Sequence, residues 1–118
     1  MKKIILVTVT IFFTLVSSCL SDDNDLYEFK IALTHEEIDD LLFLREEEKL
    51  ARDVYLYSYN KYNVQIFKNI SNSEIQHMNN VLQLLNKYNL QDSASPNIGE
   101  FNNVTLQSIY NELIIKGA

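Results

Sequence analysis

A Glu-x-x-His pair inside a helical pattern constrains the fold of this chain more than any other stretch. Apolar residues recur at helical spacing between about residues 64 and 89. Glu74 and His77 stand three positions apart, so they share one face of that helix. The same face carries the apolar residues Ile70, Met78, Val81, Leu85 and Tyr88. The pattern predicts a carboxylate and an imidazole that face the core, where each needs a partner such as a metal ion.

Each residue of the pair also has a purely structural interpretation. If the helix began at Ser71, Glu74 would complete a capping box with it. Because Phe67 and Ile70 continue the apolar face upstream, we expect the helix to begin before Phe67. His77 alone would be interpreted as a hydrogen-bonded core histidine. Its spacing from Glu74 favours a ligand role for both residues.

A preceding helix is predicted from Thr34, which forms a capping box with Glu37, to about Tyr59. A helical wheel places five residues on its polar side: Arg45, Glu46, Lys49, Arg52 and Asp53. Glu46 is expected in solvent, Glu48 at the margin, and Glu47 near the centre of the apolar face. We predict Glu47 as a metal ligand. The alternative is a carboxylate paired with Arg45 or Arg52.

The rest of the chain offers no further ligand. Residues 91–103 form a polar connection, and residues 104–116 form a third amphipathic helix that Gly117 ends. The chain of 118 residues has only two Gly and one Pro. We therefore predict one all-α domain over residues 34–118.

The N-terminus has the pattern of a targeting signal. A basic start precedes an apolar run, Ile4 to Val16, that is too short to span a bilayer. The following Val16-Ser17-Ser18-Cys19 resembles a bacterial lipoprotein lipobox, which implies a signal peptide at 1–18 and lipidation of Cys19. Residues 19–33 then form an acidic tether. We expect a lipid-anchored protein of the cell envelope, periplasmic or surface-exposed; the alternative is a plain secretory signal.

Charge limits the partners. Without Lys2 and Lys3 of the signal, the chain has eight basic and sixteen acidic residues, a net charge of about −8. No basic patch is visible, which argues against a nucleic-acid partner. Cys19 is the only cysteine, so no internal disulfide can form.

Several longer motifs resemble those of one family. They are Leu44-Arg45-Glu46-Glu47-Glu48-Lys49-Leu50-Ala51-Arg52-Asp53-Val54-Tyr55, Phe67-x-Asn69-Ile70-x-x-Ser73-Glu74-x-x-His77, Gly99-x-Phe101 and Leu106-Gln107-x-x-Tyr110. Together they resemble the ferritin-like domain-of-unknown-function family 2202. The resemblance implies an antiparallel four-helix bundle in which two metal ions, iron or manganese, are held by glutamates and Glu-x-x-His motifs.

By position, the implied ligands are Glu47, with Glu48 as the alternative, together with Glu74 and His77. Such a centre implies oxidation of ferrous iron with dioxygen or peroxide as acceptor. Tyr55 could tune the centre or donate an electron, but core packing is the better explanation for it.

The chain departs from the family pattern at its C-terminal side. Members continue with two further helices, whereas this chain stops at Ala118, so half of the implied ligands are missing. One expectation is a half bundle that completes a site for two ions as a homodimer. The other is a degenerate, metal-free helical surface lipoprotein that acts as an interaction module.

Overall fold

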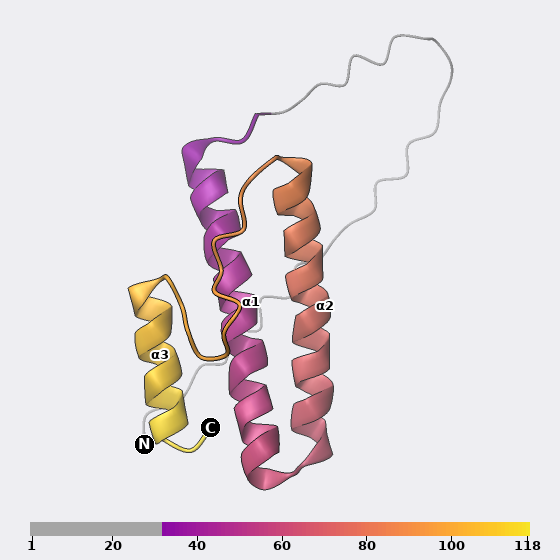
Figure 1. Cartoon of the computed structure of the whole chain (residues 1–118), viewed down its shortest axis with the longest axis vertical. Coiled ribbons are helices and arrows are strands. Elements are labelled where there is room, and N and C mark those ends of the chain that lie inside the picture. Colours follow the sequence, from indigo (N-terminus) through magenta and orange to yellow (C-terminus); the bar gives the residue numbers. More distant parts are fainter. Residues whose placement is uncertain (1–31) are drawn as a thin grey trace, which may run out of the picture.

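The computed structural model describes residues 32–118. The predicted signal peptide, the lipobox-like Cys19 and nearly all of the tether lie outside the described residues. Three helices are formed, α1 (His35–Tyr62), α2 (Gln65–Lys87) and α3 (Val104–Ile115), and no strand occurs between residues 32 and 118. The predicted all-α class is confirmed (Figure 1). Within this region, no helix combines the length and the apolar character that a membrane crossing requires.

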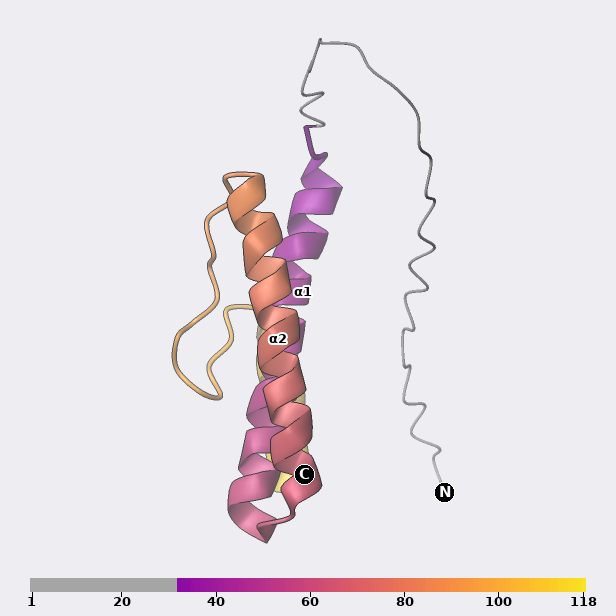
Figure 2. The same ribbon diagram turned by 90° about the vertical axis from the view of Figure 1, so that its right-hand side faces the viewer.

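The ends of α1 follow from local chemistry. The predicted capping box is present: Thr34 Oγ1 accepts from Glu37 N–H at 3.2 Å, and Glu37 Oε2 accepts from Thr34 N–H at 2.8 Å. At the other end Asn63 adopts a left-handed conformation with φ 53°, which reverses the chain within two residues. As a result α2 runs antiparallel beside α1 (Figures 1 and 2).

The start of α2 excludes a capping role for Glu74. Because α2 begins at Gln65, Ser71 lies inside the helix and cannot cap it. Its hydroxyl instead donates to Arg52 O on α1 at 3.3 Å. The capping-box alternative for Glu74 is therefore wrong, and Glu74 lies in the helix interior.

The apolar core has two parts, one on each side of α1. Met78, Val81 and Leu85 of α2 are buried, as their shared face predicted. On the other side Leu50 packs with Phe101 and Leu106. Within residues 32–118, α1 contacts both other helices, whereas α2 and α3 do not contact each other (Figure 1). Among the described residues, no helix covers the surface of α1 between α2 and α3.

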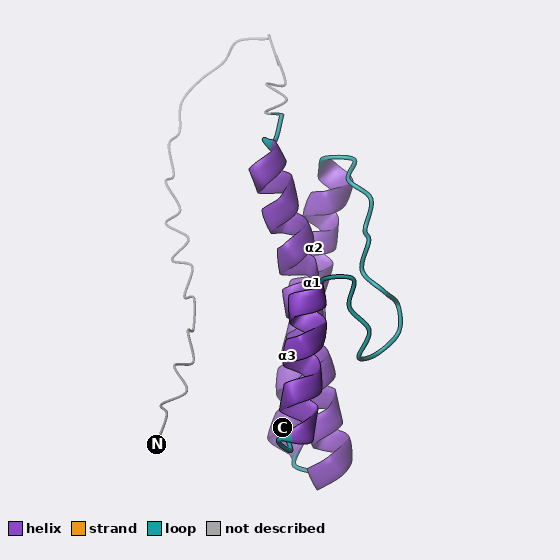
Figure 3. Ribbon diagram, turned by 90° about the vertical axis from the view of Figure 1, so that its left-hand side faces the viewer, coloured by secondary structure: helices purple, strands orange, loops and turns teal. Residues whose placement is uncertain are grey.

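The connection between α2 and α3 returns along one face of α1 (Figures 1 and 3). It covers part of the side of α1 that the helical wheel predicted to be polar and exposed. Three residues of the expected polar side are at most 4% exposed: Glu46, Lys49 and Asp53. The Glu46 carboxylate accepts from the N–H groups of Asn102 and Asn103, each at 2.7 Å. The prediction that Glu46 lies in solvent was wrong, because the connection covers it.

Lys49 and Asp53 of α1 hold the same connection against α1 through hydrogen bonds. Lys49 Nζ donates to Asp53 at 2.7 Å and to the carbonyls of Asn97 and Glu100 at 2.7 and 3.0 Å. Asp53 also accepts from Gly99 N–H at 2.9 Å. Among the described residues, every buried side-chain nitrogen and oxygen has a hydrogen-bond partner.

The motif around Gly99 is explained by the turn it makes. Gly99 has φ +77°, and a Cβ there would lie 2.8 Å from the Tyr110 ring. Gln107 accepts from Phe101 N–H and donates to Gly99 O. The rings of Phe101 and Tyr110 pack 5.4 Å apart. These residues join the connection to α3 and hold both against α1.

Candidate metal centre

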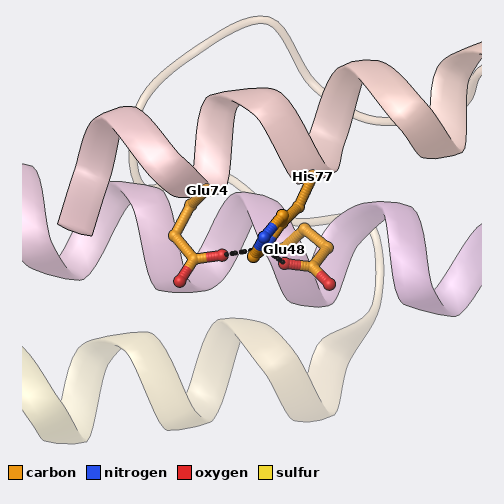
Figure 4. A group of neighbouring side chains, drawn as sticks. All are labelled: Glu48, Glu74 and His77. Atoms are coloured by element: carbon orange, nitrogen blue, oxygen red, sulfur yellow. Dashed lines mark hydrogen bonds and ion pairs between the residues drawn. The ribbon is translucent and has the colours of Figure 1, made fainter. Parts of the chain in front are cut away.

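Three side chains from two helices meet on the face of α1 that faces away from the connection. Glu48 comes from α1, and Glu74 and His77 come from α2 (Figure 4). His77 Nδ1 lies 2.9 Å from Glu74 Oε2 and 3.3 Å from Glu48 Oε2. One potential ligand atom from each residue lies within 4.8 Å of the other two. We call these three residues the Glu48–Glu74–His77 triad.

Helix geometry explains why Glu48 joins the triad while its neighbours do not. Glu48 points about 200° away from Glu46 around α1, so one faces α2 and the other the connection. The sequence predicted Glu47 as the ligand and Glu48 as its alternative; the structure places Glu48 beside Glu74 and His77. Glu47 is exposed and lies outside the triad. It lines an apolar groove instead.

The signal that favours Glu48 was present in the sequence. Glu48 precedes Ala51 and Tyr55 by three and seven residues, the spacing of a stripe that faces a neighbouring helix. Tyr55 stacks on Phe67 of α2 with ring centroids 6.3 Å apart. Tyr55 also lies about 10 Å farther along α1 than Glu48, at 1.5 Å per residue, which fits core packing better than contact with the triad.

The two predicted core-facing residues of α2 differ in burial. The Glu74 side chain is 16% exposed, but that of His77 is 54% exposed. The expectation of a buried imidazole was wrong for the described residues, because neither α3 nor the connection covers this side of α2. The triad therefore opens to the surface.

Electrostatics hold the three side chains together. Burial raises the pKa of Glu48, and the hydrogen bond and negative charge of Glu74 raise it further, while His77 acts in the opposite direction. Burial lowers the pKa of His77, but the hydrogen bonds and charges of Glu74 and Glu48 outweigh it, and the net pKa is raised. Two carboxylates this close thus favour a bound cation, either a proton or a metal.

The spacing of the triad fits a metal ion. Adjacent ligands of an octahedral ion with bonds of about 2.1 Å lie about 3.0 Å apart. The two contacts of His77 Nδ1, at 2.9 and 3.3 Å, are close to this separation. A set of two carboxylates and one imidazole combines ligands that suit iron, manganese and zinc. An ion held here would have further coordination positions open toward solvent.

Comparison with known proteins identifies the family. The pattern of the family described as "Uncharacterized protein domain (DUF2202)" matches residues 37–118. The chain belongs to the DUF2202 family. It is 49% identical over 89 residues to the uncharacterized protein MJ0754 of Methanocaldococcus jannaschii, a match over 75% of this chain and 48% of that protein. The match covers α2, α3, the whole triad and all of α1 except its first two residues.

A crystal structure of the hypothetical protein MJ0754 resembles the fold, with a TM-score of 0.70 and 44% sequence identity. The match covers 85% of this chain and 53% of that one. The chain thus spans about half the length of the relative it matches. The DUF2202 helices described above are accompanied in that relative by a comparable length of additional chain.

Proposed function

We propose that this DUF2202 protein is a ferritin-like metal-binding protein whose Glu48–Glu74–His77 triad holds iron or manganese. The observation that carries the proposal is the convergence of Glu48 with a Glu-x-x-His motif across two antiparallel helices. Di-metal carboxylate bundles use the same elements, one Glu from a helix and Glu-x-x-His from its neighbour, each supplied twice. The triad corresponds to half of such a ligand set.

Each residue has a defined role in this proposal. Glu48 and Glu74 supply carboxylate oxygens that neutralise the cation, and His77 supplies Nδ1 after it loses its proton. Bound iron would supply one-electron chemistry with dioxygen or peroxide, as in oxidation of ferrous iron. The open side of the triad would admit small oxidants, since His77 is half exposed.

We propose a location in the cell envelope on separate grounds. Cys19 is the only cysteine and stands where the lipobox-like motif requires it. A diacylated or triacylated Cys19 would anchor the domain without a transmembrane helix. Replacement of Cys19 by serine should move the protein from the membrane fraction to the soluble fraction. Unchanged membrane association would contradict the anchor.

A metal titration tests the proposed function. Calorimetry with Mn²⁺, which avoids oxidation during the experiment, should give saturable binding to the purified protein. Glu48→Ala, Glu74→Ala and His77→Ala should each weaken binding at least about tenfold, since each removes a ligand. Glu112→Ala is the control, because Glu112 is an exposed carboxylate that pairs with Lys116 and lies outside both the triad and the apolar groove. Equal binding by wild type and Glu48→Ala would overturn the proposal.

A further inference from the structure

The uncovered face of α1 carries an apolar groove next to the triad. The groove has a volume of about 590 Å³. Residues from all three helices line it, among them Leu50, Ala51, Val54, Tyr55, Phe67 and Leu113. Glu47 is the only charged side chain in this lining. A groove of this composition on a solvent-facing surface is typical of an interaction site.

The apolar surface continues along α2 on both sides of His77. Ile66, Ile70, His77 and Leu84 recur at spacings of four and seven residues, so they share one face of α2. Ile66 is 54% exposed and Leu84 is 41% exposed. His77 is thus the polar centre of an apolar stripe in which Ile66 and Leu84 are exposed and Ile70 is partly buried. We call the groove and this stripe together the open face.

Ligand number and charge point to a second copy of this chain as the partner of the open face. In a two-fold dimer each copy presents the same patch to the other. Two triads would then supply four carboxylates and two imidazoles, the ligand set of a di-metal bundle. Without metal, four facing carboxylates would oppose the association, and two divalent cations would neutralise them.

We infer that the open face binds a second copy of this chain, and that divalent metal at the two triads drives the association. This inference rests on the proposed metal site. The α1–α2 hairpins of the two copies form a four-helix bundle, and each ion is enclosed by residues of both copies. Because binding linkage is reciprocal, metal must strengthen the dimer and the dimer must strengthen metal binding by the same factor.

Sedimentation of the purified protein with Mn²⁺ and with chelator tests the inference. We expect a monomer with chelator and a species of about twice the monomer mass with Mn²⁺. The apparent Mn²⁺ affinity should rise at least about fivefold between protein concentrations far below and far above the dimer dissociation constant. A monomer that binds Mn²⁺ with one affinity at all protein concentrations overturns the dimer and leaves the proposed function intact. Absence of Mn²⁺ binding at every concentration overturns both.

Variants on the open face distinguish dimerisation through that face from metal binding at the triad. Ile66→Lys places a charge on the stripe three turns from His77 and should prevent the Mn²⁺-dependent dimer. Leu84→Lys, two turns beyond His77, provides a second test if the first variant misfolds. The matched control is Ile115→Lys, because Ile115 is 84% exposed and lies on the side of α3 opposite Leu106. Dimerisation of a folded Ile66→Lys or Leu84→Lys protein like wild type would overturn the inference.

Discussion

Removal of the Asp53 carboxylate should destabilise this protein more than any surface substitution. Asp53 is fully buried and accepts from Lys49 Nζ at 2.7 Å, Arg52 Nε at 2.7 Å and Gly99 N–H at 2.9 Å. In Asp53→Ala the Lys49 ammonium, only 1% exposed, keeps its two carbonyl acceptors but loses its counter-ion. Removal of one partner of a buried ion pair costs about 3–5 kcal/mol. The connection and α3 should loosen together.

Urea unfolding followed by circular dichroism, with chelator present, measures this cost. Since the urea dependence for small proteins is about 1–3 kcal/mol per molar, the midpoint should fall by at least about 1 M. Glu112→Ala is the control, because it breaks an exposed pair with Lys116 worth less than about 0.5 kcal/mol. If Asp53→Ala lowers the free energy of unfolding by no more than Glu112→Ala does, Asp53 does not hold the α2–α3 connection against α1 and the reasoning is refuted.

Three further predictions concern packing, backbone and pH. Gly99→Ala should lower the free energy of unfolding by about 1–3 kcal/mol in the same assay, because it strains a positive φ and meets the Tyr110 ring; an unchanged midpoint would contradict this. Leu85→Ala removes a fully buried side chain and should cost about 2–5 kcal/mol; a cost near zero would place Leu85 outside the core. Hydrogen bonds from the backbone and side chain of Thr34 lower the pKa of Glu37 below 4.5, so the contribution of this capping box is complete above pH 4.5 and is lost as pH falls through the lower folded value. Thr34→Ala should therefore reduce the acid dependence of stability between pH 5 and pH 2, and an identical acid profile would argue against the box.

The helices could be predicted from the sequence because their signals are local. The capping box at Thr34 and the apolar face of Met78, Val81 and Leu85 were each sufficient to place an element, and the structure confirms them. The wheel also brought Glu74 and His77 to one face. These signals depend only on neighbours within a few turns.

The sequence did not show in the same way which faces of α1 and α2 are buried by other parts of the chain. The connection at residues 88–103 has no periodicity, so nothing in the sequence indicated that it would return over α1 and bury Glu46, Lys49 and Asp53. A charged side chain can be buried where backbone N–H and C=O groups satisfy it, and a wheel does not show those groups. The exposure of His77 was missed for the converse reason: its face is apolar, but no described element packs on it.

Glu47 and Glu48 are adjacent, so their side chains point only about 100° apart around α1. The sequence does not say on which side of α1 the next helix packs, so it could not decide between them. Both residues lie toward the apolar side of α1. Only the position of α2 distinguishes them: Glu48 reaches His77 at 3.3 Å, whereas Glu47 lines the groove. The central claim is therefore a claim about Glu48, Glu74 and His77 as one site.

Anomalous diffraction from crystals grown with Mn²⁺ tests that claim most directly, because it locates the ion itself. We predict an anomalous peak about 2 Å from His77 Nδ1 and from one carboxylate oxygen each of Glu48 and Glu74. The peak should be absent from crystals of Glu48→Ala grown in the same way. A fully occupied Mn²⁺ elsewhere on the chain, with no peak at the triad, would contradict the account.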